Sequence, residues 1–240
     1  MILDEQVIKY HALDNWFKTP QGMRVGHAFA SELKGPAALL SGKRLLQLGN
    51  CGDNPWLSAL KFNHKWFVTP CETLQKTAIV ASLTSLPIDR SSIDCVIAPL
   101  TLDAFGHEKN PLDEIDRILK PMGYVVFLGM NPWSFWGAAL RWGHVPCFGD
   151  TAGIPCSSLL LKKSMLSRGY SQCMLSSFYY IPPVTGKTLI HRLEFFNEMG
   201  KMIWPFPAGF YCFIVQKYQP ASPSFIFNNY DDDLLYVARN

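Results

Sequence analysis

The sequence predicts an α/β fold built around a mostly parallel β-sheet. Three short apolar runs, at 45–48, 93–98 and 124–129, have the length of buried strands; a glycine follows the first and closes the third. The segments between them place apolar residues three or four positions apart, as amphipathic helices do. Strands and helices that alternate at this spacing form right-handed βαβ units, so we expect parallel strands covered on both faces.

The first half of the chain supplies the central strands of this sheet. Residues 1–40 are helical and amphipathic, and we interpret them as an N-terminal lid or flanking helix. After the strand at 45–48, Asn54-Pro55 resembles an N-cap with proline at the first helical position, so a helix is expected from Asn54. Further strands are expected at 65–68 and at 93–98, the latter rich in β-branched residues.

The second half continues the alternation. Leu112, Ile115 and Ile118 share one helical face, and Lys120-Pro121-Met122-Gly123 should end that helix. We assign residues 130–156 as a substrate-side insertion. The other expected elements are helices at 134–142, 157–168 and 187–202, and strands at 124–129, 172–180 and 210–216.

Composition indicates one folded domain. The chain has 240 residues, 48% of them hydrophobic and 17% charged, which is enough apolar material for a single sizeable core. We therefore assign 1–220 to one domain and 221–240 to a polar, acidic tail. The net charge of +3 is small and the basic residues are scattered, so nucleic-acid binding is not indicated.

Neither a metal site nor a membrane segment is indicated. The seven cysteines include no CxxC pair and no neighbouring histidine cluster at zinc-ligand spacing. The N-terminus carries acids where a secretory signal would have a basic region, and no apolar run approaches the roughly 20 residues of a spanning helix. We expect a cytoplasmic protein with reduced thiols.

The turn at 45–52, which reads LLQLGNCG, is the most informative segment. Glycine after a buried parallel strand lets the backbone approach a ligand, and such sheets bind ligands beyond the carboxyl ends of their strands. The same glycine also fits a tight turn that only needs a positive φ at Gly49. The turn by itself leaves both interpretations open.

Three later segments make the interpretation specific. Leu86-Pro87 precedes the strand at 93–98, residues 112–123 read LDEIDRILKPMG, and residues 129–137 read GMNPWSFWG. In this order the segments resemble class I S-adenosylmethionine-dependent methyltransferases, especially the methyltransferase type 11 group and, for the last segment, a bacterial subgroup of it. The resemblance implies a Rossmann-like class I methyltransferase fold, with a mostly parallel seven-stranded sheet, helices on both faces and an antiparallel last strand.

The resemblance also implies S-adenosylmethionine as cofactor. Gly49 would lie under its methionine part, Thr69 near its ribose, and Ser82 beside its adenine, while Leu100 would flank the sulfonium. The full set of implied cofactor residues is Gln47, Gly49, Asn50, Thr69, Ser82, Leu83, Leu100 and Thr101.

A small-molecule acceptor would bind under the insertion and the N-terminal helix. Trp16, Asn131 and Trp133 are the candidates for the substrate side, although the tryptophans fit ordinary core packing equally well. Methyl transfer is an in-line displacement that alignment alone can promote, so a catalytic base is not required.

If the acceptor must lose a proton, three side chains are candidate bases. His107, His144 and Asp103 are expected in loops near the carboxyl edge of the sheet. Each is more simply explained as a hydrated loop residue.

The sequence departs from the family at the acids that hold the cofactor. Gln47 stands two residues before the first glycine where the family has an acid, Val68-Thr69-Pro70 lacks the ribose-binding acid, and Ser82 replaces the adenine-side acid. Each lost charge-assisted hydrogen bond typically weakens binding by roughly 1.5–3 kcal/mol. Two hypotheses follow: methyl transfer to a small molecule, or a non-catalytic binding or scaffolding protein that keeps the fold.

Overall fold

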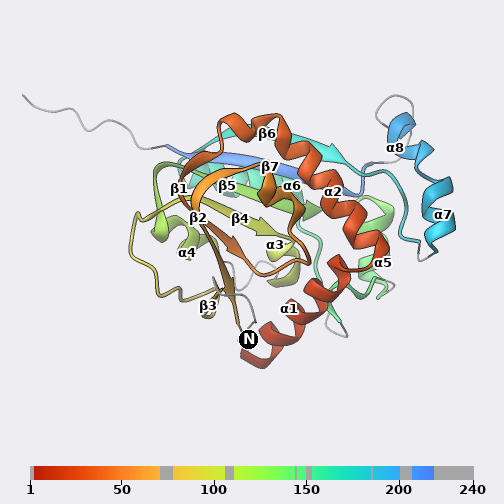
Figure 1. The fold of residues 1–240 in the computed structure, drawn as a ribbon, viewed down its shortest axis with the longest axis horizontal. Coiled ribbons are helices and arrows are strands. Elements are labelled where there is room, and N and C mark those ends of the chain that lie inside the picture. Colours follow the sequence, from red (N-terminus) through yellow and green to blue (C-terminus); the bar gives the residue numbers. More distant parts are fainter. Residues whose placement is uncertain are drawn as a thin grey trace, which may run out of the picture.

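A seven-stranded sheet in the order β3-β2-β1-β4-β5-β7-β6 organises the computed structural model (Figure 1). The structure describes residues 3–70, 78–105, 111–143, 145–149, 153–184, 186–200 and 207–218. Strands β1 to β5 pair in parallel, whereas β7 is antiparallel to both β5 and β6. The strands are β1 Ser41–Leu48, β2 Lys61–Thr69, β3 Ala78–Val80, β4 Ile93–Pro99, β5 Leu119–Met130, β6 Tyr170–Phe178 and β7 Phe210–Lys217. This arrangement confirms the predicted sheet and its antiparallel last strand.

Helices surround the sheet. In Figure 1, α2 crosses in front of the sheet, α1 lies below it near β3, and α7 and α8 project at the right. The α-helices are α1 Leu3–Phe17, α2 Pro20–Lys34, α3 Thr101–Phe105, α4 Leu112–Ile118, α5 Phe135–Arg141, α6 Ser158–Ser167, α7 Lys187–Arg192 and α8 Phe195–Gly200. Three short 3-10 turns are η1 Pro36–Ala38, η2 Pro55–Ser58 and η3 Pro146–Phe148. None of the described helices is both long and apolar enough to cross a lipid bilayer.

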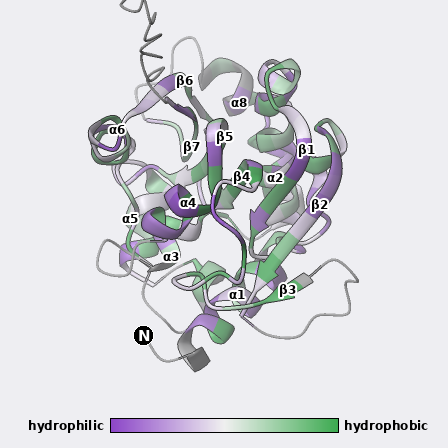
Figure 2. Cartoon of the chain, turned by 90° about the vertical axis from the view of Figure 1, so that its left-hand side faces the viewer, coloured by the Kyte–Doolittle hydropathy of each residue, from purple (hydrophilic) through white to green (hydrophobic). Residues whose placement is uncertain are grey.

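Strands β1 and β5 become more buried toward the ends at which they leave the sheet. The first four residues of β1 are exposed and its last four are buried, and β5 changes in the same way after Tyr124. Figure 2 shows this change from hydrophilic to hydrophobic along β1 and β5. The carboxyl ends of the strands, where ligands bind in parallel sheets, are therefore the most deeply embedded part of the fold.

The helix expected from Asn54 is absent, and that prediction was wrong. The connection from β1 to β2 contains only the 3-10 turn η2, because Asn54 adopts a left-handed conformation with φ 46°. Helix α2 covers this face of the sheet in its place. Phe29 of α2 packs edge-on against Trp56, with ring centroids 5.1 Å apart, and stacks on Phe178 of β6 at 6.2 Å.

The helix expected at 187–202 is interrupted. Helix α7 ends at Arg192 and α8 begins at Phe195. At the break, Glu194 forms an ion pair with Arg24 of α2, and one turn later the side chain of Asn197 accepts a hydrogen bond from the Tyr180 amide. These tertiary contacts fix the second piece in an orientation that helical periodicity cannot predict.

Candidate functional site

The ends of β1, β2 and β4 meet at one edge of the sheet, as the sequence predicts. Gly49 follows β1 with φ 88°, and its amide donates to the carbonyl of Val68 in β2 at 2.7 Å. Leu100 follows β4 with φ 51°, a conformation that stores strain in a residue with a Cβ. Non-glycine residues held in this way cluster at functional sites, and Leu100 is one of the predicted cofactor residues.

A polar network closes the turn after Gly49. The Gln47 amide donates to Asn54 Oδ1 at 2.6 Å and to the Gly49 carbonyl at 2.9 Å, and its oxygen accepts from the Trp56 indole at 2.9 Å. Asn54 in turn donates to the Gly52 carbonyl at 3.0 Å and accepts from the Cys51 amide at 3.2 Å. The Gln47 side chain therefore holds the turn rather than facing a ligand.

This network explains why an acid is missing at position 47. A carboxylate could accept the Trp56 hydrogen bond, but it could not donate to Asn54 Oδ1 or to the Gly49 carbonyl. Glutamine both donates and accepts, so it satisfies all three partners inside a fully buried site.

Helix α1 lies across the predicted cofactor edge. Its Tyr10 ring packs directly on Gly49: a Cβ added to Gly49 would lie 2.1 Å from Tyr10 Cε1. The Tyr10 hydroxyl lies near the side chain of Thr101, at the start of α3. Tyr10 thus spans the space between the ends of β1 and β4.

Three further side chains fasten α1 to the same edge. Asp14 accepts hydrogen bonds from the Gly52 amide and from Asn50 Nδ2, both at 2.9 Å. Gln6 contacts the Ser82 hydroxyl at 3.3 Å, and Lys9 donates to the Ala104 carbonyl at 2.7 Å. Most of the predicted cofactor residues are consequently buried: Gln47, Gly49, Thr69, Leu83, Leu100 and Thr101.

Four residues of α1 touch this edge and were not predicted from the sequence, namely Gln6, Lys9, Tyr10 and Asp14. Gln6, Tyr10 and Asp14 are spaced four apart, which places them on one face of a helix. That spacing was available in the sequence, but nothing in it showed what the face would cover.

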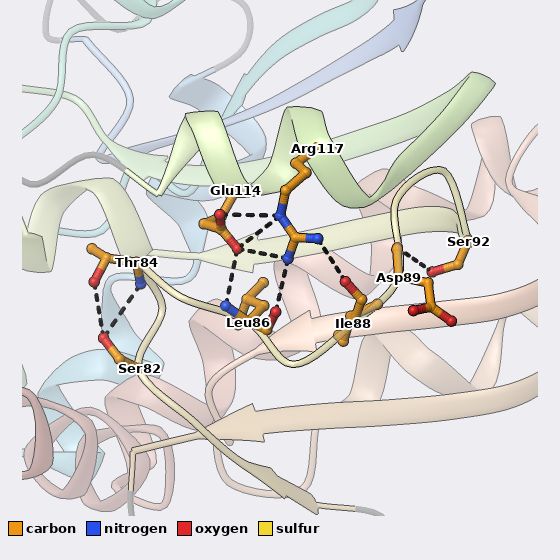
Figure 3. A network of polar contacts seen from close by, with 8 residues as sticks. All are labelled: Ser82, Thr84, Leu86, Ile88, Asp89, Ser92, Glu114 and Arg117. Atoms are coloured by element: carbon orange, nitrogen blue, oxygen red, sulfur yellow. Dashed lines mark hydrogen bonds and ion pairs between the residues drawn. The ribbon is translucent and has the colours of Figure 1, made fainter.

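The two family-like segments around Leu86 and Arg117 bind each other (Figure 3). The Arg117 guanidinium donates to the carbonyls of Leu86 and Ile88, each at 2.7 Å, and pairs with Glu114 at 2.9 Å. Glu114 also accepts from the Leu86 amide at 2.9 Å. The Leu86-Pro87 turn and the helix α4 motif are therefore linked, because Arg117 and Glu114 hold the turn in place.

Asp103 lies in α3 and is fully buried, whereas the sequence placed it in a loop. Its carboxylate accepts from the backbone amides of Cys156 at 2.8 Å and Met130 at 3.3 Å. Burial raises the pKa of Asp103 to about 7, although those backbone hydrogen bonds partly oppose the shift. Its position makes Asp103 an anchor between the end of β5 and the segment that leads into α6.

Asp103 should make stability fall as the pH rises. An aspartate in an unfolded chain has a pKa of about 3.9, so between about pH 4 and pH 7 the folded state holds a proton that the unfolded state has lost. Asp103→Asn removes this titration, so urea unfolding should show the variant gaining stability relative to the parent across that window. Asp113→Asn, at a side chain that is 81% exposed, is the control. An equal pH slope in Asp103→Asn and the parent would contradict the assignment.

The three predicted substrate-side residues lie in different environments. Trp16 is buried in an aromatic cluster, with ring centroids 4.9 Å from Phe17 and 5.8 Å from Trp136. Trp133 is 80% exposed. Asn131 stabilises the turn after β5, where its side chain donates to the Ala208 carbonyl and accepts from the Trp133 amide.

The predicted bases His107 and His144 lie outside the described residues. Within the described ranges, no three His, Cys, Asp or Glu side chains come together as a metal site.

Comparisons with known proteins agree with this architecture. Residues 59–127 match the sequence model of a family described as a methyltransferase domain. An S-adenosylmethionine-dependent methyltransferase of Thermotoga maritima is 19% identical, with a TM-score of 0.59, and the match covers 87% of this chain and 99% of that chain. A comparison with curated protein sequences gave no match.

Two other solved structures share the fold. One is a chain from the complex of the Haloferax volcanii Trm112 methyltransferase activator, at 16% identity and a TM-score of 0.58, covering 84% of this chain and 94% of that chain. The other is geranyl diphosphate C-methyltransferase from Streptomyces coelicolor, at 13% identity and a TM-score of 0.52, covering 78% and 79% respectively. The chain therefore has the Rossmann-like class I methyltransferase fold, and its residues 59–127 are similar to a methyltransferase domain.

Proposed function

We propose that the chain binds S-adenosylmethionine at the edge formed by Gly49, Thr69 and Leu100, and transfers its methyl group to a small molecule. The supporting observation is the meeting of these residues at the carboxyl ends of β1, β2 and β4, within a sheet of class I order. Neighbours described as S-adenosylmethionine-dependent enzymes support the choice of cofactor.

The residues present fit the methionine end of this cofactor. The Gly52 amide and Asn50 Nδ2 both donate to a carboxylate, that of Asp14, and so have the chemistry to hold the carboxylate of the cofactor. At the ribose end, Thr69 offers only a neutral hydroxyl, and at the adenine end Ser82 and Leu83 offer one hydroxyl and an apolar side chain. The fit predicts binding weaker than in relatives with acids at these positions.

When bound, the cofactor supplies a methyl group on a positively charged sulfur. The chain's own contribution is orientation and exclusion of water by Leu100 and Thr101, both buried. No proton transfer is required of Asp103, whose carboxylate is committed to backbone amides.

We place the acceptor beside the loop after β5. Trp133 presents an exposed aromatic surface there, which favours a neutral or apolar acceptor over a polyanion. We further place the reaction in the cytoplasm, because the six cysteines of the described residues are all free thiols.

Calorimetry with S-adenosylmethionine and S-adenosylhomocysteine tests cofactor binding. We expect saturable heat in the micromolar to millimolar range, because one or more acid contacts of roughly 1.5–3 kcal/mol each are missing. Absence of heat at millimolar ligand, with folding verified by circular dichroism, in both the parent and the Asp14→Asn variant described below, would contradict the proposal.

A second candidate is a non-catalytic protein that keeps the fold as a binding or scaffolding module. The burial of Gln47 in the turn network and the cover of α1 over Gly49 favour it. Thr69→Asp together with Ser82→Asp restores two family acids and decides between the candidates. Binding that appears only after restoration supports the scaffold, whereas binding by the parent that restoration changes less than about threefold excludes it.

A further inference from the structure

The Asp14 carboxylate accepts the two hydrogen bonds that we assigned above to the carboxylate of the cofactor. The donors are the Gly52 amide and the Asn50 side-chain amide. Both distances are 2.9 Å, as expected for charge-assisted hydrogen bonds. One carboxylate can use these two donors at a time.

Tyr10 occupies the neighbouring volume. Its ring lies against Gly49 and its hydroxyl reaches Thr101, so it fills the space between the ends of β1 and β4. Tyr10 is itself buried, at 5% exposure. Any molecule that passes over Gly49 must therefore displace this ring.

The remaining contacts extend the cover of α1 to Ser82 and to α3. Gln6 contacts Ser82 at the adenine side, and Lys9 reaches the Ala104 carbonyl in α3. The 3-10 turn η3 and Gly149 back the helix from outside, since a Cβ on Gly149 would lie 3.4 Å from the Ala12 side chain. Side chains of α1 thus lie within the proposed cofactor site, in contact with its residues.

We infer that α1 is an intramolecular competitor of the cofactor: Asp14 and Tyr10 hold the methionine subsite closed, and binding requires the release of α1. This inference rests on the proposed cofactor site. If only a fraction of molecules has α1 released, the apparent dissociation constant rises by the inverse of that fraction. Removing contacts that hold α1 on the site should therefore strengthen cofactor binding. If α1 were a lid that closes over bound cofactor, the same removal would weaken binding.

Two variants weaken the contacts between α1 and the proposed cofactor site in different ways. Asp14→Asn removes the charge of the competing carboxylate and keeps its size, and Tyr10→Ala empties the space above Gly49. Each should lower the dissociation constant of S-adenosylhomocysteine, measured by calorimetry, by about tenfold or more.

Matched variants control for unspecific effects. Tyr10→Phe keeps the ring on Gly49, and Asp53→Asn removes a carboxylate from an exposed position in the same turn. Each should change the dissociation constant by less than about threefold. If Tyr10→Ala fails to fold, the dissociation constant of Asp14→Asn alone decides the test.

Amide hydrogen exchange of residues 3–17 gives a second readout. Saturating S-adenosylhomocysteine should make these amides exchange faster in the parent, because the ligand displaces the helix. Slower exchange on binding, or variants that bind no more tightly than the parent, would overturn the competitor role and leave the proposed function intact. If exchange shows α1 released in Asp14→Asn and no variant binds the ligand, both the competitor role and the proposed cofactor site are wrong.

Discussion

Gly49→Ala is expected to destabilise the protein by roughly 2–5 kcal/mol. Two causes add. The backbone at Gly49 has φ 88°, which costs a residue with a Cβ about 1–2 kcal/mol. The new methyl group would also lie 2.1 Å from Tyr10 Cε1, so the ring or the whole of α1 must move. Urea unfolding followed by circular dichroism measures the loss.

A double-mutant cycle separates the two causes. In a Tyr10→Ala background the steric overlap is gone, so Gly49→Ala should cost only about 1–2 kcal/mol for the backbone conformation. An equal cost in both backgrounds would show that Tyr10 does not lie on Gly49. Because the same steric overlap pushes α1 away from Gly49, the amides of α1 should also exchange faster in Gly49→Ala.

Arg117→Ala is expected to cost about 2–3 kcal/mol of unfolding free energy. It removes hydrogen bonds to two backbone carbonyls and the ion pair with Glu114, at a side chain that is 25% exposed. Arg117→Lys should recover less than half of this, since an ammonium cannot reproduce the planar fork that reaches Leu86 and Ile88 together. Thermal and urea unfolding measure both variants.

Arg168→Ala is the control for Arg117. Its ion pair with Asp113 lies on the surface and should contribute less than about 1 kcal/mol. The Arg117 hydrogen bond also holds the pKa of Glu114 below its usual range. The stabilisation from this pair is therefore complete above the unfolded pKa of glutamate and is lost as the pH falls through the folded value. Equal losses for Arg117→Ala and Arg168→Ala would contradict the role given to the network.

The strands were predictable because their apolar runs are short, buried and bounded by glycine or proline. Residues 45–48, 93–98 and 124–129 fall within β1, β4 and β5, and the antiparallel last strand followed from the resemblance. The helix from Asn54 was not predictable, because Asn-Pro fits both a helix N-cap and the left-handed residue before a 3-10 turn. Only the network of Gln47, Asn54 and Trp56 decides between them, and it joins residues whose contact the sequence does not show.

The position of the candidate site in the fold was easier to predict from the sequence than the side chains that fill it. Gly49, Thr69 and Leu100 were assigned from the resemblance, and the structure places each of them at or directly after the carboxyl end of a strand. Asp103 was taken for a loop residue because its burial depends on amides of β5 and of the segment before α6, which are far away in the chain. Asp14 and Tyr10 were missed for a related reason: helical spacing defines a face but does not name its partner.

The use of α2 in place of a helix after β1 has a consequence for how the chain folds during synthesis. Gln21 of α2 donates to the carbonyl of Pro182, which is 161 residues further along the chain, and Phe29 stacks on Phe178. At a synthesis rate of roughly 5–20 residues per second, α2 waits about 10–30 seconds for this partner, although its contact with Trp56 can form earlier. The nascent chain should therefore depend on chaperones or low temperature for a good yield of soluble protein, more than a relative whose sheet is covered by a helix made between its first two strands.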